Sequence, residues 1–330
     1  MNYLCTFMDN YDNELFYPPK PILEETKEHF SWLYTIGSLF LFILAFAYFF
    51  SDQISFILIL VIALIIHELG HFFLMKIFGY QNVVMIFIPL MGAFVNGKKK
   101  KYSQFESLLV VAAGPFPGML LGFLFLVVNS QYPNEIYFLI AIVFIALNSI
   151  NLLPLDPLDG GQLLRLLVSK DSDLFLLIFS LISSLTLIVS GFFLDNWYLM
   201  GFGFFLAFRV RNVQKRYYMR KIFRQKNIDY VIDYNDLSNK GYAAMKEVIL
   251  DNSSLLRRLK GMEENEEEED EINRMLADQV NYYLVAPMAN DTPLLVKLGI
   301  VIFWLASFVI PLYFLLVVNP FFIDYGVLYR

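Results

Sequence analysis

The sequence predicts an all-α polytopic membrane protein with six to seven transmembrane helices, a re-entrant β-like loop and a small cytoplasmic helical insert. Two observations predict this class. Of the 330 residues, 58% are hydrophobic and 17% are charged, and the mean hydropathy is +0.55. Apolar segments of about 20 residues, the length that crosses the hydrocarbon core of a bilayer, recur along the chain. This composition excludes a soluble domain, a disordered chain and a nucleic-acid-binding protein.

The apolar segments set the number of helices. Six of them are long enough, or nearly so, to span a membrane. A seventh, residues 197–208, would rise only about 18 Å at 1.5 Å per residue, so it needs residues from the preceding segment to cross. The six segments are residues 32–50, 54–78, 105–128, 136–153, 174–194 and 294–318.

Basic residues predict the orientation of these helices. They gather at residues 98–101, at Arg165 and Lys170, and in residues 209–226. All three groups fall on one side of the membrane if the helices alternate, and such groups face the cytoplasm. We therefore expect a multi-pass protein of the cell (inner) membrane. Residues 1–29 lack the pattern of a cleavable signal peptide.

Two stretches interrupt the helical pattern. Residues 83–95, VVMIFIPLMGAFV, are apolar but contain proline and glycine and are too short to span. They predict a re-entrant or interfacial β-like loop. Residues 151–161, NLLPLDPLDGG, combine two prolines with two glycines, which predicts unwound backbone. Unwound backbone at membrane depth is tolerated only where it is buried in protein or lines a wet cavity.

His67, Glu68 and His71 form an H-E-x-x-H pattern within the second apolar segment. Residues i and i+4 lie on one face of a helix, so both imidazoles can reach one ion, and Glu68 can then approach a metal-bound water. The alternative is that these groups are satisfied by hydrogen bonds inside a helix bundle. Ionisable groups in a membrane helix cost on the order of 3 kcal/mol each and usually serve function, which favours the metal site.

A catalytic zinc ion usually has three protein ligands and an open fourth position. The remaining histidine, His29, precedes the first membrane helix, so we expect the third ligand to be a carboxylate. Asp156 and Asp159 are the candidates, because both lie on the broken helix, and Asp159 is preferred because two glycines follow it. The alternative is that one or both aspartates cap the next helix.

HELGH in one membrane helix and N-x-x-P-x-x-P-L-D-G-G near the end of a later one resemble the site-2 protease family of intramembrane zinc metalloproteases. The resemblance covers roughly residues 54–168. It implies that His67, His71 and Asp159 bind zinc and that Glu68 is the general base. It also implies that Asn151 helps to bind the substrate, and that residues 87–95 pair with an extended substrate.

Residues 112–115, AAGP, look like the A-G-P motif of the same family. Many members place an asparagine shortly after this motif, whereas Phe116, Pro117 and Gly118 follow here, so a role for that asparagine cannot be transferred. Gly114, Gly118 and Gly122 instead form a row of small residues at a spacing of four. Such a row is typical of close helix packing.

These features predict an intramembrane zinc metalloprotease that hydrolyses a peptide bond in or near a transmembrane segment. The expected partners are a membrane-protein substrate with a transmembrane helix and the lipid bilayer, with the active site near the cytoplasmic face. A metal transporter, or a metal-dependent peptidase acting on soluble or lipidated peptides, is the alternative. The expected parts are a cytoplasmic segment (1–29), a membrane protease core (30–209), a basic then acidic cytoplasmic helical insert (210–290), and a C-terminal transmembrane helix with its tail (291–330).

Overall fold

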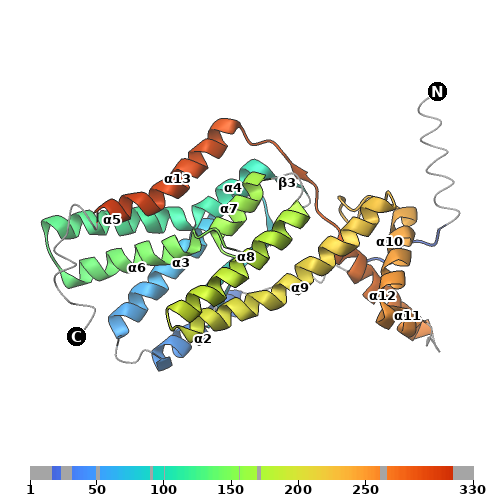
Figure 1. Cartoon of the computed structure of the whole chain (residues 1–330), viewed down its shortest axis with the longest axis horizontal. Helices are drawn as coiled ribbons and strands as arrows, with labels where there is room; N and C mark the ends of the chain where they lie inside the picture. The colour runs from blue at the N-terminus through green and yellow to red at the C-terminus, as the bar shows by residue number, and fades with distance from the viewer. Residues whose placement is uncertain are drawn as a thin grey trace. The chain divides into compact units, whose positions relative to one another are not determined.

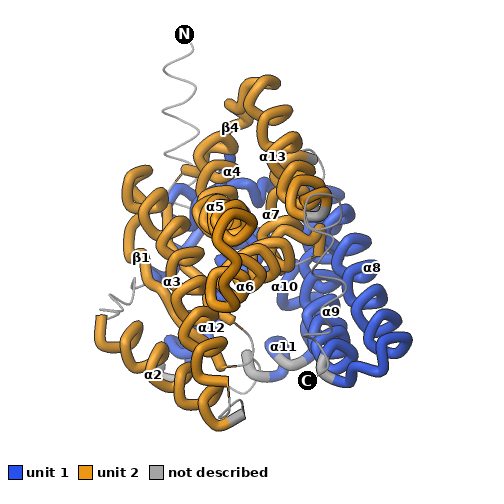
Figure 2. Tube along the Cα trace, turned by 90° about the vertical axis from the view of Figure 1, so that its left-hand side faces the viewer, with its two compact units in different colours: residues 1–27, 173–288 blue, residues 28–172, 289–330 orange. Residues whose placement is uncertain are grey.

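A computed structural model gives the fold of the chain, which is mostly helical (Figure 1). The chain divides into two compact units, residues 1–27 with 173–288 and residues 28–172 with 289–330 (Figure 2). Each unit is considered by itself. The structure describes residues 17–23, 32–49, 53–89, 92–99, 101–155, 157–168, 172–260 and 266–314.

The unit formed by residues 28–172 and 289–330 is built around helix α3. This helix packs against α4, α5 and α6, and α5 and α6 run side by side (Figure 1). Helix α13 contacts α5, where the ring centres of Phe303 and Phe116 lie 5.5 Å apart. The helices are α2 (Trp32–Phe49), α3 (Ile54–Ile77), α4 (Gln104–Ala113), α5 (Pro115–Gln131), α6 (Glu135–Asn151), α7 (Asp159–Val168) and α13 (Leu294–Tyr313), and a short strand, β3 (Tyr102–Ser103), precedes α4.

Within the part of the chain that the structure describes, four helical segments are long and apolar enough to cross a membrane: Ile54–Ile77, Gln104–Gln131, Asp173–Phe193 and Leu294–Pro311. Two shorter apolar helices, Trp32–Tyr48 and Glu135–Asn151, match the other two predicted segments in position. Helix α13 leaves large apolar side chains such as Ile302 and Val309 uncovered by protein. A helical membrane protein is therefore supported, and the number of six to seven spans stays a prediction.

Two predicted helices have different bounds in the structure. The segment expected as one helix over residues 105–128 is divided at Gly114 into α4 and α5, because Pro115 has no N–H to continue the helical hydrogen bonds. The short segment expected at residues 197–208 is the first part of a 29-residue helix, α9 (Trp197–Gln225), which continues through the basic residues.

The predicted β-like loop is an antiparallel hairpin of β1 (Gln81–Ile88) and β2 (Gly92–Lys98). It follows α3 directly. This helix ends in a left-handed turn, in which Gly79 has φ +74° and the N–H of Tyr80 bonds to the carbonyl of Met75. Met85 and Phe87 of β1 are buried against α2 and α3. The β structure of this stretch is confirmed, whereas its position relative to a membrane stays a prediction.

The other unit contains an apolar helix, α8 (Ser172–Phe193), and a group of short helices around the second half of α9. Phe223, Met245 and Tyr283 lie at the centre of its core. The Arg220 guanidinium pairs with Asp173 and donates to the carbonyl of Tyr283 at 3.0 Å. The remaining elements are α10 (Asn239–Asn252), α11 (Ser254–Lys260), α12 (Glu266–Tyr283) and β4 (Met288–Ala289). The last residue of β4 belongs to the unit formed by residues 28–172 and 289–330.

Candidate metal centre

His67 and His71 project from the same face of α3, one turn apart, as their spacing predicts. Their ring centres lie 5.0 Å apart, and the two Nε2 atoms are separated by 3.2 Å. Helix α3 is continuous over this turn, and both side chains are buried. The H-E-x-x-H pattern therefore forms the two-histidine face that a single ion requires.

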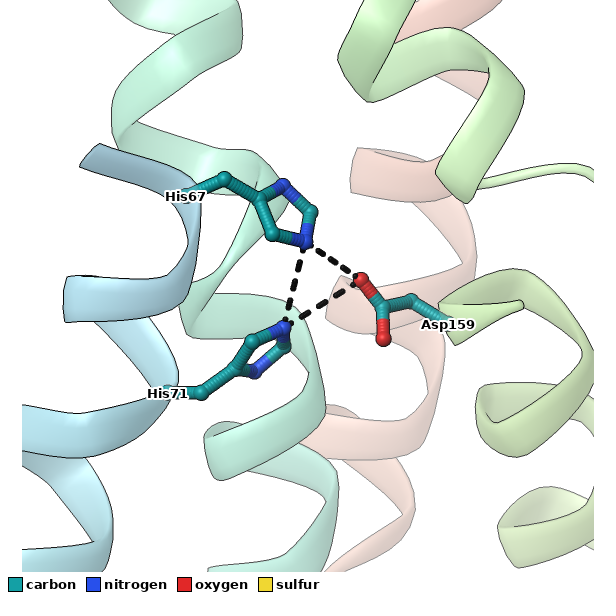
Figure 3. Close-up of side chains that lie close together, drawn as sticks. All are labelled: His67, His71 and Asp159. Atoms are coloured by element: carbon teal, nitrogen blue, oxygen red, sulfur yellow. Dashed lines mark hydrogen bonds and ion pairs between the residues drawn. The ribbon is translucent and has the colours of Figure 1, made fainter. Parts of the chain in front are cut away.

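Asp159 points toward both imidazoles from the start of α7 (Figure 3). Its Oδ2 atom lies 3.0 Å from Nε2 of His67 and 3.3 Å from Nε2 of His71. The three residues form a buried group that could hold a metal ion. The preference for Asp159 as the third ligand agrees with this geometry, and Asp156 lies outside the described residues.

Contacts from three helices hold α7 and the end of α6 against which it packs. A Cβ on Gly160 would lie 2.0 Å from the carbonyl oxygen of Leu152, so α7 begins directly against the end of α6. The indole N–H of Trp304, on α13, donates to that same carbonyl at 2.6 Å. The amide of Gln104, on α4, donates to the carbonyl of Leu166 at 2.6 Å. The position of Asp159 is thus fixed by contacts with residues that are distant in the sequence.

The donor and acceptor pattern of the site fits a cation. Nδ1 of His71 lies 2.8 Å from the carbonyl of Val110, and Nδ1 of His67 lies 2.8 Å from Oδ1 of Asn148. Both partners accept hydrogen bonds, so each neutral ring carries its proton on Nδ1 and presents a lone pair at Nε2. Nε2 of His67, Nε2 of His71 and Oδ2 of Asp159 therefore converge, and all three atoms are acceptors.

The separations also suit a tetrahedral ion. Two ligands with bonds of about 2.0–2.1 Å to a tetrahedral zinc ion lie about 3.3 Å apart. The three separations here are 3.0, 3.2 and 3.3 Å. His67, His71 and Asp159 therefore fit a metal ion by the identity, the burial and the spacing of their ligand atoms.

Glu68 lies beside the metal ligands on α3 and is only 3% exposed. Among the residues that the structure describes, no group donates a hydrogen bond to its Oε2 atom, which is buried. A buried carboxylate oxygen without a partner is costly in free energy unless another molecule contacts it. This carboxylate is thus available to a bound water or substrate.

The side chains of Asn151 and Asn148 contact different groups. Asn151, which the sequence singled out, donates from Nδ2 to the carbonyl of Leu147 one turn earlier, at 3.2 Å. Asn148, which the sequence reasoning missed, contacts His67 and is fully buried. A signal was present, because Asn148 is a polar residue inside an apolar helix. The role of Asn151 in substrate binding stays a prediction.

Two glycines let α3 approach the junction of α4 and α5. A Cβ on Gly70 would lie 1.9 Å from the carbonyl oxygen of Ala113. A Cβ on Gly114 would lie 2.1 Å from Nε2 of His71. The row of small residues at Gly114, Gly118 and Gly122 therefore packs closely, as predicted, and its first member also makes room for a metal ligand.

Comparison with known proteins agrees with this site. Residues 55–135 match the model of peptidase family M50, the family of the site-2 proteases. A zinc metalloprotease of Methanocaldococcus jannaschii is 27% identical over 118 residues, which are 34% of this chain and 34% of that protein. Stage IV sporulation protein FB of Bacillus subtilis is 31% identical over 133 residues, 40% of this chain and 46% of that protein.

These matches confirm the resemblance that the motifs predicted. The matching segment includes His67, Glu68 and His71 and ends before Asp159. The alignments span about a third to a half of the length of these relatives.

Proposed function

We propose that the chain is an intramembrane zinc metalloprotease that hydrolyses a peptide bond in or near a transmembrane segment of a membrane protein. The convergence of His67, His71 and Asp159 at separations of 3.0–3.3 Å carries this proposal. The position of the two histidines within a helix that could span a membrane supports the membrane substrate. The zinc metalloprotease among the relatives supports the choice of metal.

His67, His71 and Asp159 would hold the zinc ion. When bound, zinc supplies a Lewis acid that polarises the scissile carbonyl and lowers the pKa of the attacking water. The Glu68 carboxylate accepts the proton of that water and returns it to the leaving amine. Its buried Oε2 atom, which has no hydrogen-bond donor among the described residues, suits this exchange. Asn151 is proposed to bind the substrate near the same place.

A substrate helix must unwind before its carbonyl can reach the site, and an added strand would replace its lost hydrogen bonds. One edge of the hairpin already has partners. The N–H of Phe87 donates to the hydroxyl of Ser38 at 3.2 Å, and the hydroxyl of Thr35 donates to the carbonyl of Met85 at 2.8 Å. Helix α2 therefore covers the outer edge of β1 at these two residues.

The outer edge of β2 is the proposed docking edge. In an antiparallel pair, residues that face away from the partner strand lie opposite one another. Met85 pairs with Val95, and Phe87 pairs with Ala93. Since Met85 and Phe87 direct their backbone groups to α2, those of Val95 and Ala93 point away from β1. An extended substrate segment could pair with them.

The membrane arrangement completes the proposal. Six to seven helices would span the membrane, with the groups of basic residues on the cytoplasmic side. The hairpin would be re-entrant or interfacial, and residues 210–290 would form a cytoplasmic insert. The site would then lie near the cytoplasmic face of the cell (inner) membrane.

Replacement of Glu68 tests the catalytic assignment. The E68Q variant keeps the shape of the side chain but cannot accept a proton, so we expect cleavage of a transmembrane substrate to fall at least 100-fold, within the range of about 10²–10⁴ for lost acid–base catalysis. Zinc content should not change. E135Q, at an exposed glutamate on α6, is the matched control. Full peptidase activity of purified E68Q would contradict the proposal, and metal flux into liposomes that survives the substitution would favour a transporter.

A further inference from the structure

The two histidines are held on their Nδ1 sides by different kinds of group. The partner of His71 is a backbone carbonyl, that of Val110, which any residue at this position would supply. The partner of His67 is a side chain, that of Asn148 on α6, 81 residues away in sequence. Only the second contact depends on the identity of one residue.

A second hydrogen bond settles the orientation of the Asn148 amide. Its Nδ2 atom lies 2.7 Å from the carbonyl oxygen of Phe144, which can only accept. The NH₂ group must therefore face Phe144, and Oδ1 must face His67. An oxygen at this place requires a proton on Nδ1 of His67, which leaves Nε2 free to bind a metal ion.

Gly118 on α5 provides the space for this amide. A Cβ on Gly118 would lie 2.1 Å from Nδ2 and 2.9 Å from Oδ1 of Asn148. Asn148 is itself 0% exposed, so the amide has no room to move aside. The absence of a side chain at position 118 and the amide at position 148 thus depend on each other.

We infer that Asn148 is a positioning residue, which holds His67 in the tautomer and ring orientation that bind the metal ion, and that Gly118 is required for this contact. The inference rests on the proposed metal site, because it gives Asn148 a role in binding that ion. A hydrogen-bond partner on the second nitrogen of a metal-binding histidine fixes the ring, and its loss typically weakens metal affinity 10–100-fold. Asn148 touches neither the ion nor the substrate.

The experiment measures zinc affinity of the full chain in detergent, by competition with a chelator, together with the visible spectrum of the Co²⁺-loaded protein. N148L keeps the branching of the side chain at Cγ but removes the acceptor, and we expect zinc affinity to fall about 10–100-fold, with a changed Co²⁺ spectrum. N148D retains an acceptor for His67, and we expect its affinity to stay within about threefold of the wild type, although its contact with Phe144 is lost. If N148L does not fold, the zinc affinities of N148D and N148S are compared instead.

Matched controls separate positioning from packing. N129L replaces another buried asparagine, whose Oδ1 accepts from the N–H of Asn134 rather than from a histidine. G122A introduces a milder clash one turn from Gly118, because a Cβ there would lie 2.8 Å from Cγ1 of Ile145. We expect N129L and G122A to lower thermal stability and leave zinc affinity unchanged, whereas G118A should lower zinc affinity.

Two results would overturn the inference: wild-type zinc affinity in N148L, or an equal loss of affinity in N148L and N129L. The double variant G118N/N148A gives a further check, since an amide built from α5 would enter the same space. It should bind zinc more tightly than N148A does. A wild-type protein that binds zinc but cleaves no substrate would refute the proposed protease and leave the positioning role standing, whereas one that binds no zinc would refute both.

Discussion

Single residues without reactive groups decide whether the metal ligands can meet. Gly114 and Gly70 have no chemistry of their own, yet each lies where one added carbon would collide with the site or its immediate support. Protein interiors are close-packed, so such a collision must displace a neighbour. At Gly114 the neighbour is the imidazole of His71, and displacing it would change the ligand geometry directly.

We expect G114A to reduce bound zinc and peptidase activity at least tenfold. The added Cβ would displace the imidazole of His71 and so weaken the bond of one of the three proposed ligands to the ion. G299A is the matched control, because a Cβ on Gly299 of α13 would have no neighbour within 4 Å among the described residues. In a helix, that control should stabilise the protein by up to about 1 kcal/mol. Elemental analysis and thermal unfolding of both variants check this expectation, which equal zinc contents would contradict.

At the level of elements, the hairpin and the start of α4 both depend on backbone hydrogen bonds that a substitution can test. The proposed docking edge of β2 gives the first test. Proline cannot donate a backbone hydrogen bond, so V95P should reduce cleavage of a transmembrane substrate several-fold without loss of zinc. T35V removes a hydroxyl from the covered edge instead and should not reduce it. Equal cleavage by V95P and the wild type would argue against docking on β2.

The start of α4 gives a pH-dependent prediction. Ser103 caps this helix by accepting from the N–H of Glu106, and the carboxylate of Asp291 accepts from the N–H of Phe105 at 3.1 Å. The hydrogen bond from Ser103, followed by that from the Phe105 backbone, lowers the pKa of Asp291 below its ordinary value of 3.8. Because the folded state favours the ionised carboxylate, the stabilisation is present above this ordinary value and is lost as the pH falls through the lowered pKa.

Amide hydrogen exchange at the start of α4 checks this prediction. After correction for the intrinsic rate, protection of the Phe105 amide should fall when the pH is lowered from 6 to below 3.8. D291N retains an acceptor oxygen but does not titrate, so its protection should not follow this pH dependence. The same pH dependence in D291N would show that another group is responsible.

At the scale of the whole molecule, binding of the metal ion should stabilise one of the two units. All three ligands belong to the unit formed by residues 28–172 and 289–330. Zinc at about 100 times its dissociation constant would stabilise the folded state by about 2.7 kcal/mol. We expect a chelator to lower the unfolding temperature of this unit by roughly 5–10 °C, and added zinc to restore it.

Hydrogen exchange resolves where this effect occurs. Protection around α3 and α7 should fall in the chelated protein, whereas protection in the core around Phe223 and Tyr283 should not, because that unit contributes no ligand. E68Q should respond to the chelator as the wild type does. An identical response of H71A to chelator would place the metal elsewhere.

The sequence alone determined the approximate positions of the apolar helices and the chemistry within one turn of α3. Helical periodicity is local, so the spacing of His67 and His71 was sufficient to place both imidazoles on one face. The β character of the stretch after α3 was also local. The choice of Asp159 followed from its residue type and its broken helix, since few carboxylates lie in apolar surroundings.

Only the tertiary structure decided which side chains support that chemistry. The contacts of His67 with Asn148, of Gly114 with His71 and of Trp304 with the carbonyl of Leu152 join residues that lie 43 to 152 positions apart. No local pattern encodes such pairs, because they depend on how closely two helices approach and at what rotation. The division of α4 from α5 is local, because Pro115 has no N–H to continue the helical hydrogen bonds. The covered edge of β1 is not local: packing between segments chose among arrangements that local propensity left open.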